Sequence, residues 1–200
     1  MSVTVNTRIH PMGRWQPDSR GRLQEAALAL YSERGFDQTT AAQIAERAGL
    51  TERTFFRHFA DKREVLFGGS AILKERIVSA VAGAPPADGA LDAVSLGLDA
   101  AAAMLGESRQ DLARQRLSVL MANPELRERE LSKLADYASA IAATLRQRGT
   151  KEPQATLAAE SGMTVLRVAV QQWAEGDDGR GLDAIMRDAV SELRAVTTGS

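Results

Sequence analysis

The stretch that decides the fold reads TTAAQIAERAGLTERTFFRHF and covers residues 39–59. Ile44 and Ala48 lie four residues apart, which predicts a short helix with one buried face. Gly49 then supplies the backbone freedom that a tight turn requires. Thr40 and Thr51 are of a residue type that caps a following helix, the first and second helix of the motif respectively. Together these features predict a helix-turn-helix motif.

The second helix of this motif has one face for the core and one for a groove. Phe55 and Phe59 are four residues apart, so both lie on the buried side, and the small Ala45 lets the two helices approach closely. A helix that enters the major groove of DNA can offer Arg53 to a guanine edge and Thr54 to thymine or phosphate. The outward face contains Glu52, Arg53, Thr54, Arg57 and His58.

The rest of the chain also predicts helices. Apolar residues recur at spacings of three and four, as in Leu131, Leu134, Ala138 and Ile141, so strands are not needed. We expect an all-α fold of about nine helices, with Gly35, Gly149 and Gly176 in left-handed conformations at helix ends. The expected ranges are 19–35, 40–48, 51–58, 61–82, 88–105, 109–121, 124–148, 152–175 and 180–197.

Composition argues against several classes of protein. The chain has no cysteine and only two histidines, which are far apart, so we expect no metal site and no cysteine nucleophile. It shows no Gly-rich phosphate loop and no Ser/His/Asp pattern. Adjacent carboxylates such as Asp177-Asp178 are ordinarily solvated. We therefore expect no catalytic residues, no cofactor and no enzyme activity. No apolar run approaches the ~18 residues of a membrane span, and residues 1–10 contain no signal-peptide core, so we expect a cytoplasmic protein.

Charge is balanced over the whole chain but not along it. The sequence has 25 Lys and Arg against 26 Asp and Glu. Residues 1–67 contain ten basic and eight acidic groups, so the N-terminal third is modestly basic and the remainder acidic. This distribution permits a nucleic-acid contact near the N-terminus and is a weak signal by itself.

At this point the sequence resembles the TetR family of bacterial transcription regulators. The resemblance is continuous over residues 19–67 and implies an all-helical homodimeric repressor, in which three helices bind DNA and a larger helical domain binds an effector and dimerises through its last two helices. The segments that carry it are RLQEAA (22–27), YSERGF (31–36), Thr39-Thr40, Ile44-Ala45, AGLT (48–51), TFFRHF (54–59) and Lys62.

The resemblance assigns roles to individual residues. It implies phosphate contacts from Thr40, His58 and Lys62, and base-proximal contacts from the outward face of the second helix. Position 56 is usually Tyr, whose hydroxyl reaches a phosphate, whereas this chain has Phe. Position 53 is often small, so a base contact by Arg53 would be peculiar to this protein. The predicted DNA-binding residues are Thr40, Thr51, Glu52, Arg53, Thr54, Phe56, Arg57, His58 and Lys62.

Beyond residue 67 the resemblance narrows to one subgroup. The segments RQRL (114–117), NPELRER (123–129) and VAVQQW (168–173) are similar to TetR members grouped with the mycofactocin regulator, which are associated with acyl-CoA-type effectors. Arg116 would then be a counter-charge and Met121 part of an adaptable pocket for a small hydrophobic or acyl-CoA-like effector. Arginines at such positions more often extend to solvent, and methionines more often fill a core.

Three regions follow from this reading. Residues 1–17 are expected to form a flexible arm, the alternative being an arm that reaches an adjacent minor groove. Residues 18–67 form the helix-turn-helix domain, and residues 68–200 bind effector and dimerise through about 152–197. Gly68-Gly69 between them is either a site of close helix packing or a compliant joint.

The function predicted from the sequence is that of a repressor which a small-molecule effector releases from a palindromic DNA operator. The alternative is a DNA-binding dimer without small-molecule induction, or an activator. A large pocket lined by residues 88–175 would favour the first.

Overall fold

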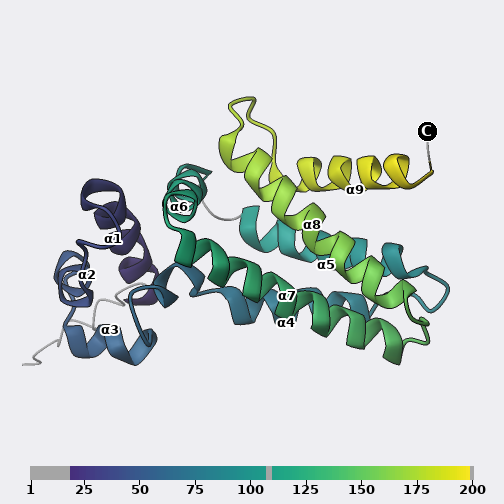
Figure 1. The fold of residues 1–200 in the computed structure, drawn as a ribbon, viewed down its shortest axis with the longest axis horizontal. Coiled ribbons are helices and arrows are strands. Elements are labelled where there is room, and N and C mark those ends of the chain that lie inside the picture. The colour runs from purple at the N-terminus through teal and green to yellow at the C-terminus, as the bar shows by residue number, and fades with distance from the viewer. Residues whose placement is uncertain (1–18, 107–109, 199–200) are drawn as a thin grey trace, which may run out of the picture.

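The computed structural model describes residues 19–106 and 110–198, and over these the chain forms nine α-helices, one short 3-10 helix and no strand (Figure 1). The all-α expectation is confirmed, while the predicted arm at 1–17 lies outside the described residues. The helices are α1 (Ser19–Arg34), α2 (Ala41–Arg47), α3 (Glu52–His58), the 3-10 helix η1 (Glu64–Phe67), α4 (Ser70–Ala82), α5 (Ala90–Gly106), α6 (Gln110–Ala122), α7 (Pro124–Gln147), α8 (Gln154–Glu175) and α9 (Leu182–Thr198).

Two local expectations were wrong. The single helix expected over 61–82 is instead η1 and α4, with Gly68 and Gly69 between them. A Cβ at Gly68 would lie 2.8 Å from the Phe59 ring and 2.9 Å from the Gln24 amide. Gly68 is therefore a site of close packing. Gly176 is extended, with φ −68° and ψ 149°, whereas Gly35 and Gly149 have the predicted positive φ.

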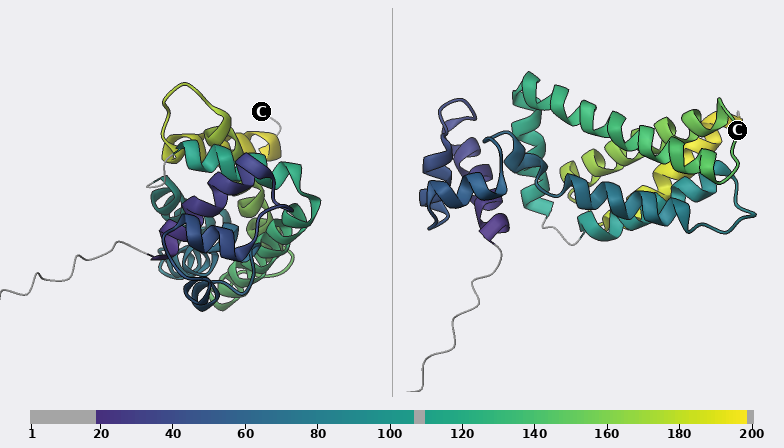
Figure 2. Two further views of the ribbon diagram at one scale, coloured as in Figure 1. Left: turned by 90° about the vertical axis from the view of Figure 1, so that its left-hand side faces the viewer. Right: turned by 90° about the horizontal axis from the view of Figure 1, so that it is seen from below.

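The molecule is elongated, with a small head at one end and a helical body at the other (Figure 2). The head consists of α1, α2, α3 and η1. In the body, α4 and α7 lie side by side beneath α5 and α8, and α9 packs across α5 and α8 (Figure 1). Helix α6 contacts α1 of the head as well as α7 and α8 of the body, so it lies between the two parts.

The hydrophobic core of the head includes residues from beyond it in sequence. Leu23, Ile44 and Phe55 form its centre, and Leu120 of α6 and Leu126 of α7 are buried in the same cluster. The head therefore packs around a layer that α6 and the start of α7 supply. This arrangement fixes the direction in which the helix-turn-helix points away from the body.

Small residues allow the body helices to approach closely. Gly162 of α8 faces Val94 of α5, and a Cβ on Gly162 would lie well inside van der Waals contact distance of Val94 Cγ1. Val94 is fully buried, so it has no free space into which to move.

We expect Gly162→Ala to destabilise the protein by about 1–3 kcal/mol, the usual cost of overpacking a filled core. Urea denaturation followed by circular dichroism measures this loss. Gly106→Ala is the control, because a Cβ there would meet nothing closer than 3.9 Å. Equal stabilities of the two variants would show that α5 and α8 separate without cost.

Candidate nucleic-acid interface

Both helices of the helix-turn-helix begin at the caps that the sequence predicts. The Thr40 side chain accepts a hydrogen bond from the Gln43 amide, and the Gln43 side chain accepts one from the Thr40 amide. The Thr51 side chain accepts a hydrogen bond from the Thr54 amide at 3.2 Å. Two unpaired amides at the start of α2 and one at the start of α3 are satisfied in this way, which sets where each short helix begins.

The turn between these helices depends on Gly49. Its φ is +64°, in the left-handed region that favours glycine. The Arg22 guanidinium of α1 donates to the Ala48 carbonyl, and a Cβ on Gly49 would lie 2.9 Å from an Arg22 nitrogen. The turn is thus closed by α1 on one side and by the Leu50 amide, which donates to the Ala45 carbonyl at 2.8 Å, on the other.

Helix α3 separates its buried and exposed residues as predicted. Phe55 is fully buried and Phe59 nearly so, whereas Glu52, Arg53 and Arg57 are exposed. Thr54 is half-buried, and its hydroxyl lies 3.0 Å from that of Thr51. An exposed face with two guanidinium groups and a carboxylate can hydrogen-bond with base edges in a major groove.

Lys62 holds the loop between α1 and α2. Its ammonium donates to the carbonyls of Phe36, Asp37 and Thr39 at 2.8, 3.2 and 3.0 Å, and it lies 4.3 Å from the centre of the Phe36 ring. The Tyr31 hydroxyl donates to the Lys62 carbonyl at 2.6 Å, and burial raises the pKa of that hydroxyl, so it stays a donor. A phosphate contact by Lys62 stays a prediction, and it would require at least one of these bonds to be exchanged.

His58 is partly enclosed. Its Nε2 atom is buried and has no hydrogen-bond partner among the described residues, and its ring centre lies 6.3 Å from that of Phe59. The predicted phosphate contact would therefore use the other ring nitrogen or a rotated ring. This role, too, stays a prediction.

The two candidate effector residues lie on α6, where Arg116 makes packing contacts and Met121 is exposed. Arg116 of α6 donates to the Leu66 carbonyl at 3.1 Å and pairs with Glu130 at 3.1 Å, and its guanidinium lies 5.6 Å from the Phe67 ring centre. Arg116 thereby joins η1 to α6 and α7. Met121 is 54% exposed.

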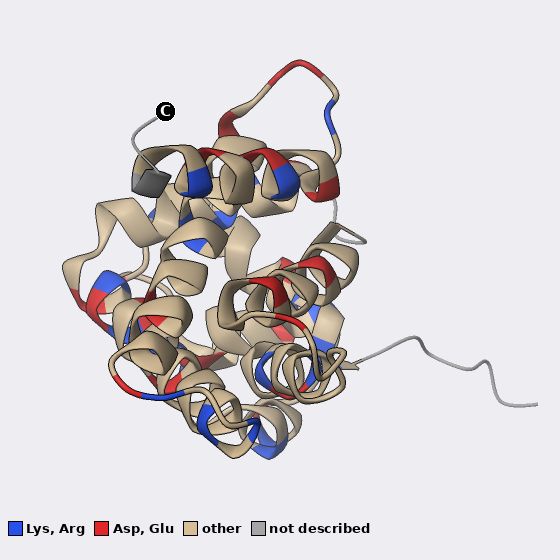
Figure 3. Cartoon of the chain, turned by 90° about the vertical axis from the view of Figure 1, so that its right-hand side faces the viewer, with Lys and Arg blue, Asp and Glu red and all other residues tan. Residues whose placement is uncertain are grey.

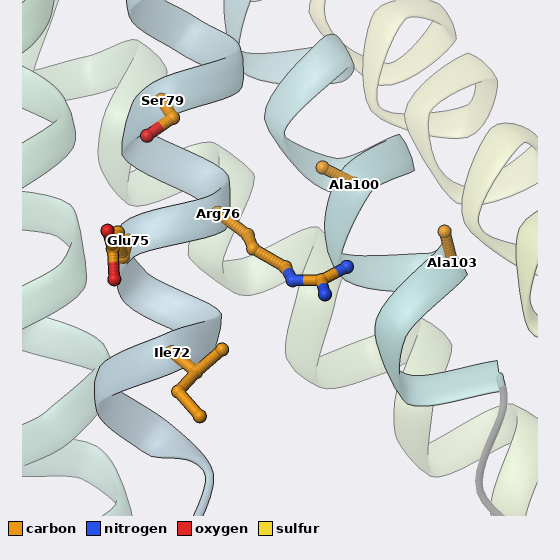
Figure 4. Close-up of a pocket in the computed structure, with 6 residues that line it drawn as sticks. All are labelled: Ile72, Glu75, Arg76, Ser79, Ala100 and Ala103. Carbon is orange, nitrogen blue, oxygen red and sulfur yellow. The ribbon is translucent and has the colours of Figure 1, made fainter.

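An open groove of about 470 Å³ runs between α4 and α5 (Figure 4). The guanidinium of Arg76 extends from α4 across it toward Ala100 and Ala103 of α5. The Arg76 side chain forms no hydrogen bond or ion pair within the part of the chain that the structure describes. Arg116 and Met121 are not among its lining residues, which are Ile72, Glu75, Arg76, Ser79, Ala100 and Ala103.

Sequence reasoning missed two of these features. Arg22 belongs to the quoted motif, but its bond to the turn joins residues 26 positions apart, which spacing alone does not reveal. Arg76 was not singled out because a lone arginine on a helix is ordinarily solvated. Over residues 19–106 and 110–198, no group of three acidic, histidine or cysteine side chains is arranged to hold a metal, and no helix is long and apolar enough to cross a membrane.

The caps, the left-handed turn and the outward charged face of α3 define a helix-turn-helix transcriptional regulator. Residues 23–67 match the family model described as bacterial regulatory proteins of the tetR family, and residues 88–198 match the MftR C-terminal domain. The chain belongs to the TetR family, with a C-terminal domain of the MftR type.

Relatives agree with this assignment. The HTH-type transcriptional regulator TcmR of Streptomyces glaucescens is 35% identical over 140 residues, which cover 67% of this chain and 61% of TcmR, so the chain spans less than two thirds of that relative. MftR of Mycobacterium tuberculosis, the proposed regulator of mycofactocin biosynthesis, is 23% identical over 162 residues, which cover 81% of each chain. The solved structure of Thermus thermophilus FadR, a transcriptional repressor in complex with lauroyl-CoA, is 25% identical with a TM-score of 0.53, covering 89% of this chain and 93% of that one.

Proposed function

We propose that the protein is a repressor that binds a palindromic DNA operator as a dimer and leaves it when a small hydrophobic or acyl-CoA-like effector binds. The observation that carries the proposal is the outward face of α3, where Glu52, Arg53 and Arg57 are exposed while Phe55 holds the helix in the core. DNA contact would come from the predicted set that includes Thr40 and the residues of α3, with α3 in the major groove. DNA in a bacterial cell places such a regulator in the cytoplasm.

Residues 152–197 would form the dimer interface. Leu157, Thr164 and Val168 lie on one exposed face of α8, where spacings of seven and four make a continuous stripe. The exposed side of α9 is largely charged, Arg187 pairs with Asp183 at 2.9 Å, and acidic and basic residues are interspersed along the helix (Figure 3). The apolar stripe of α8 is therefore the better candidate for the centre of a two-fold interface.

We expect Val168→Glu to convert the dimer to a monomer at micromolar concentration, because the two-fold axis would bring two carboxylates into an apolar contact. Size-exclusion chromatography with light scattering gives the mass. Leu131→Glu is the control, since Leu131 is also an exposed apolar residue, on α7 and outside the proposed interface, at 59% exposure against 44% for Val168. A Val168→Glu variant that keeps the dimer mass would place the interface elsewhere.

The groove between α4 and α5 is where we propose that an effector binds. An apolar wall beside the unpaired guanidinium of Arg76 suits a molecule with a hydrocarbon part and an anionic group. Helix α4 follows η1 and Gly69 directly, so a ligand that displaces α4 would act on the head. In this proposal Arg76 takes the counter-charge role predicted for Arg116, which is already paired with Glu130.

The test is selection of binding sites by the purified protein from random duplex DNA, followed by titration of the enriched site over a range of salt. We expect a palindromic site bound by a dimer, with an affinity that falls as salt rises because phosphate contacts release counterions. Lauroyl-CoA is then added to the complex. Release of DNA supports the effector proposal, and binding that lauroyl-CoA leaves unchanged favours a regulator without this class of inducer.

If no site is enriched, the same sample is analysed by mass spectrometry for a retained ligand. A folded, ligand-free dimer without any preferred site contradicts the proposed function. Release of a retained ligand followed by enrichment of a palindrome supports it.

A further inference from the structure

Phe56 differs from the other aromatic residues of the head in how far its side chain is exposed. Five others, Tyr31, Phe36, Phe55, Phe59 and Phe67, are at most 6% exposed, whereas Phe56 is 53% exposed. Its ring is held by an edge contact with Phe55, with centres 5.3 Å apart and planes at 84°. The core of α3 is completed by Phe55 and Phe59, so Phe56 is not needed to fill it.

The neighbours of Phe56 on the exposed face are charged. Glu52 and Arg53 precede it by four and three residues and so lie on the same side of α3, and Arg57 is adjacent in sequence. A bare phenyl ring among charged groups exposes apolar surface to water, and this surface is available for contact when α3 meets a partner.

The chemistry of a phenyl ring restricts what it contacts on DNA. Phe56 has no charge and no hydrogen-bond donor, so it contributes no polar bond to a phosphate or to a base edge. In the major groove the apolar group on the base-pair edges is the C5-methyl of thymine, and apolar side chains recognise it. This group fits a ring that projects from the same face as Arg53.

We propose that Phe56 is a specificity-determining residue that selects thymine at one position of each half-site by contact with the 5-methyl group. The inference rests on the proposed function, because it requires α3 to enter the major groove of an operator. Arg53 would then recognise a base edge by hydrogen bonds, and Phe56 would recognise a neighbouring base pair by apolar contact.

The experiment replaces thymine by deoxyuridine in the selected operator, one symmetric pair of positions at a time. Deoxyuridine lacks only the methyl group and keeps every hydrogen-bonding atom. With the full-length wild-type protein we expect the replacement at one symmetric pair of positions to weaken binding about 15-fold. This is about 4-fold per half-site, the effect of losing one buried methyl group in each half-site. Fluorescence anisotropy gives the dissociation constants.

Two variants assign the methyl contact to a residue. In Phe56→Ala the difference between thymine and deoxyuridine at that pair is expected to vanish, and circular dichroism confirms that the variant is folded. Thr54→Ser removes the other methyl group on the face of α3 and is expected to keep the difference.

Several results overturn the inference. Wild-type protein that binds thymine and deoxyuridine operators equally at every position has no methyl contact. A difference that survives in Phe56→Ala and is lost in Thr54→Ser assigns the reading to Thr54. A loss of affinity in Phe56→Ala that is the same for both operators places the ring against the sugar-phosphate backbone. All three leave the proposed function standing, whereas failure to bind any specific operator contradicts it.

Discussion

Replacing Arg53 with alanine is expected to reduce operator affinity by about 2–6 kcal/mol, or roughly 30- to 25,000-fold. A bidentate arginine contact to guanine is worth about 1–3 kcal/mol, and a dimer would lose two such contacts. Arg53 is exposed on α3 behind the Thr51 cap, so its removal leaves the core intact. Titrations with the selected operator and with scrambled duplex separate specific from non-specific binding.

The control for Arg53→Ala is Arg146→Ala, which removes the same charge from an exposed position near the end of α7, outside the proposed dimer interface. It is expected to leave operator affinity unchanged within about twofold, apart from a small salt-dependent effect of net charge. Equal losses in both variants would mean that overall charge, and not base contact, drives the binding. An unaltered affinity in Arg53→Ala would remove Arg53 from the reading face.

Leu120→Ala is expected to destabilise the head by about 2–5 kcal/mol, although position 120 is more than fifty residues beyond the family match that ends at residue 67. Leu120 is 1% exposed and belongs to the same core as Phe55 and Ile44. Its truncation leaves a cavity between α6 and the head. The loss is measured by urea denaturation, and weaker operator binding at 37 °C is expected to accompany it.

Met121→Ala is the matched control for this prediction. Met121 is the next residue along α6 and is largely exposed, so its truncation is expected to cost about 0.5 kcal/mol or less. If both variants lose the same stability, the contact between α6 and the head contributes nothing. Full stability in Leu120→Ala would show that the head closes its core without α6.

The sequence predicted the parts of the fold that local chemistry determines. The helix ranges followed from apolar spacing, and the caps at Thr40 and Thr51 and the turn at Gly49 followed from residue type. The sequence marked Gly68-Gly69 but could not decide between close packing and a compliant joint, because the contacts at Gly68 are with Phe59 and Gln24, which lie 9 and 44 residues away. Spacing shows which face of a helix is buried but not what buries it.

The site was predictable to a similar extent. The outward residues of α3 follow from the positions of Phe55 and Phe59, whereas the three carbonyl bonds of Lys62 come from a loop more than twenty residues earlier. The roles of Arg116 and Arg76 also depended on packing. Arg116 donates a hydrogen bond to η1 and pairs with Glu130, while Arg76 lines a groove. Neither outcome can be read from residue type, since both arginines lie on amphipathic helices.

The shared core of the head and α6 has a consequence for building chimeric regulators. A graft of residues 19–67 onto a foreign body would expose the apolar surface that Leu120 and Leu126 now cover. It would also leave Glu64 without Arg129 and Lys133 of α7, to which it is paired here. A grafted DNA-binding domain that keeps its DNA preference therefore has to include α6 and the first three turns of α7 together with residues 19–67. The unit that can be exchanged between regulators is thus discontinuous in sequence.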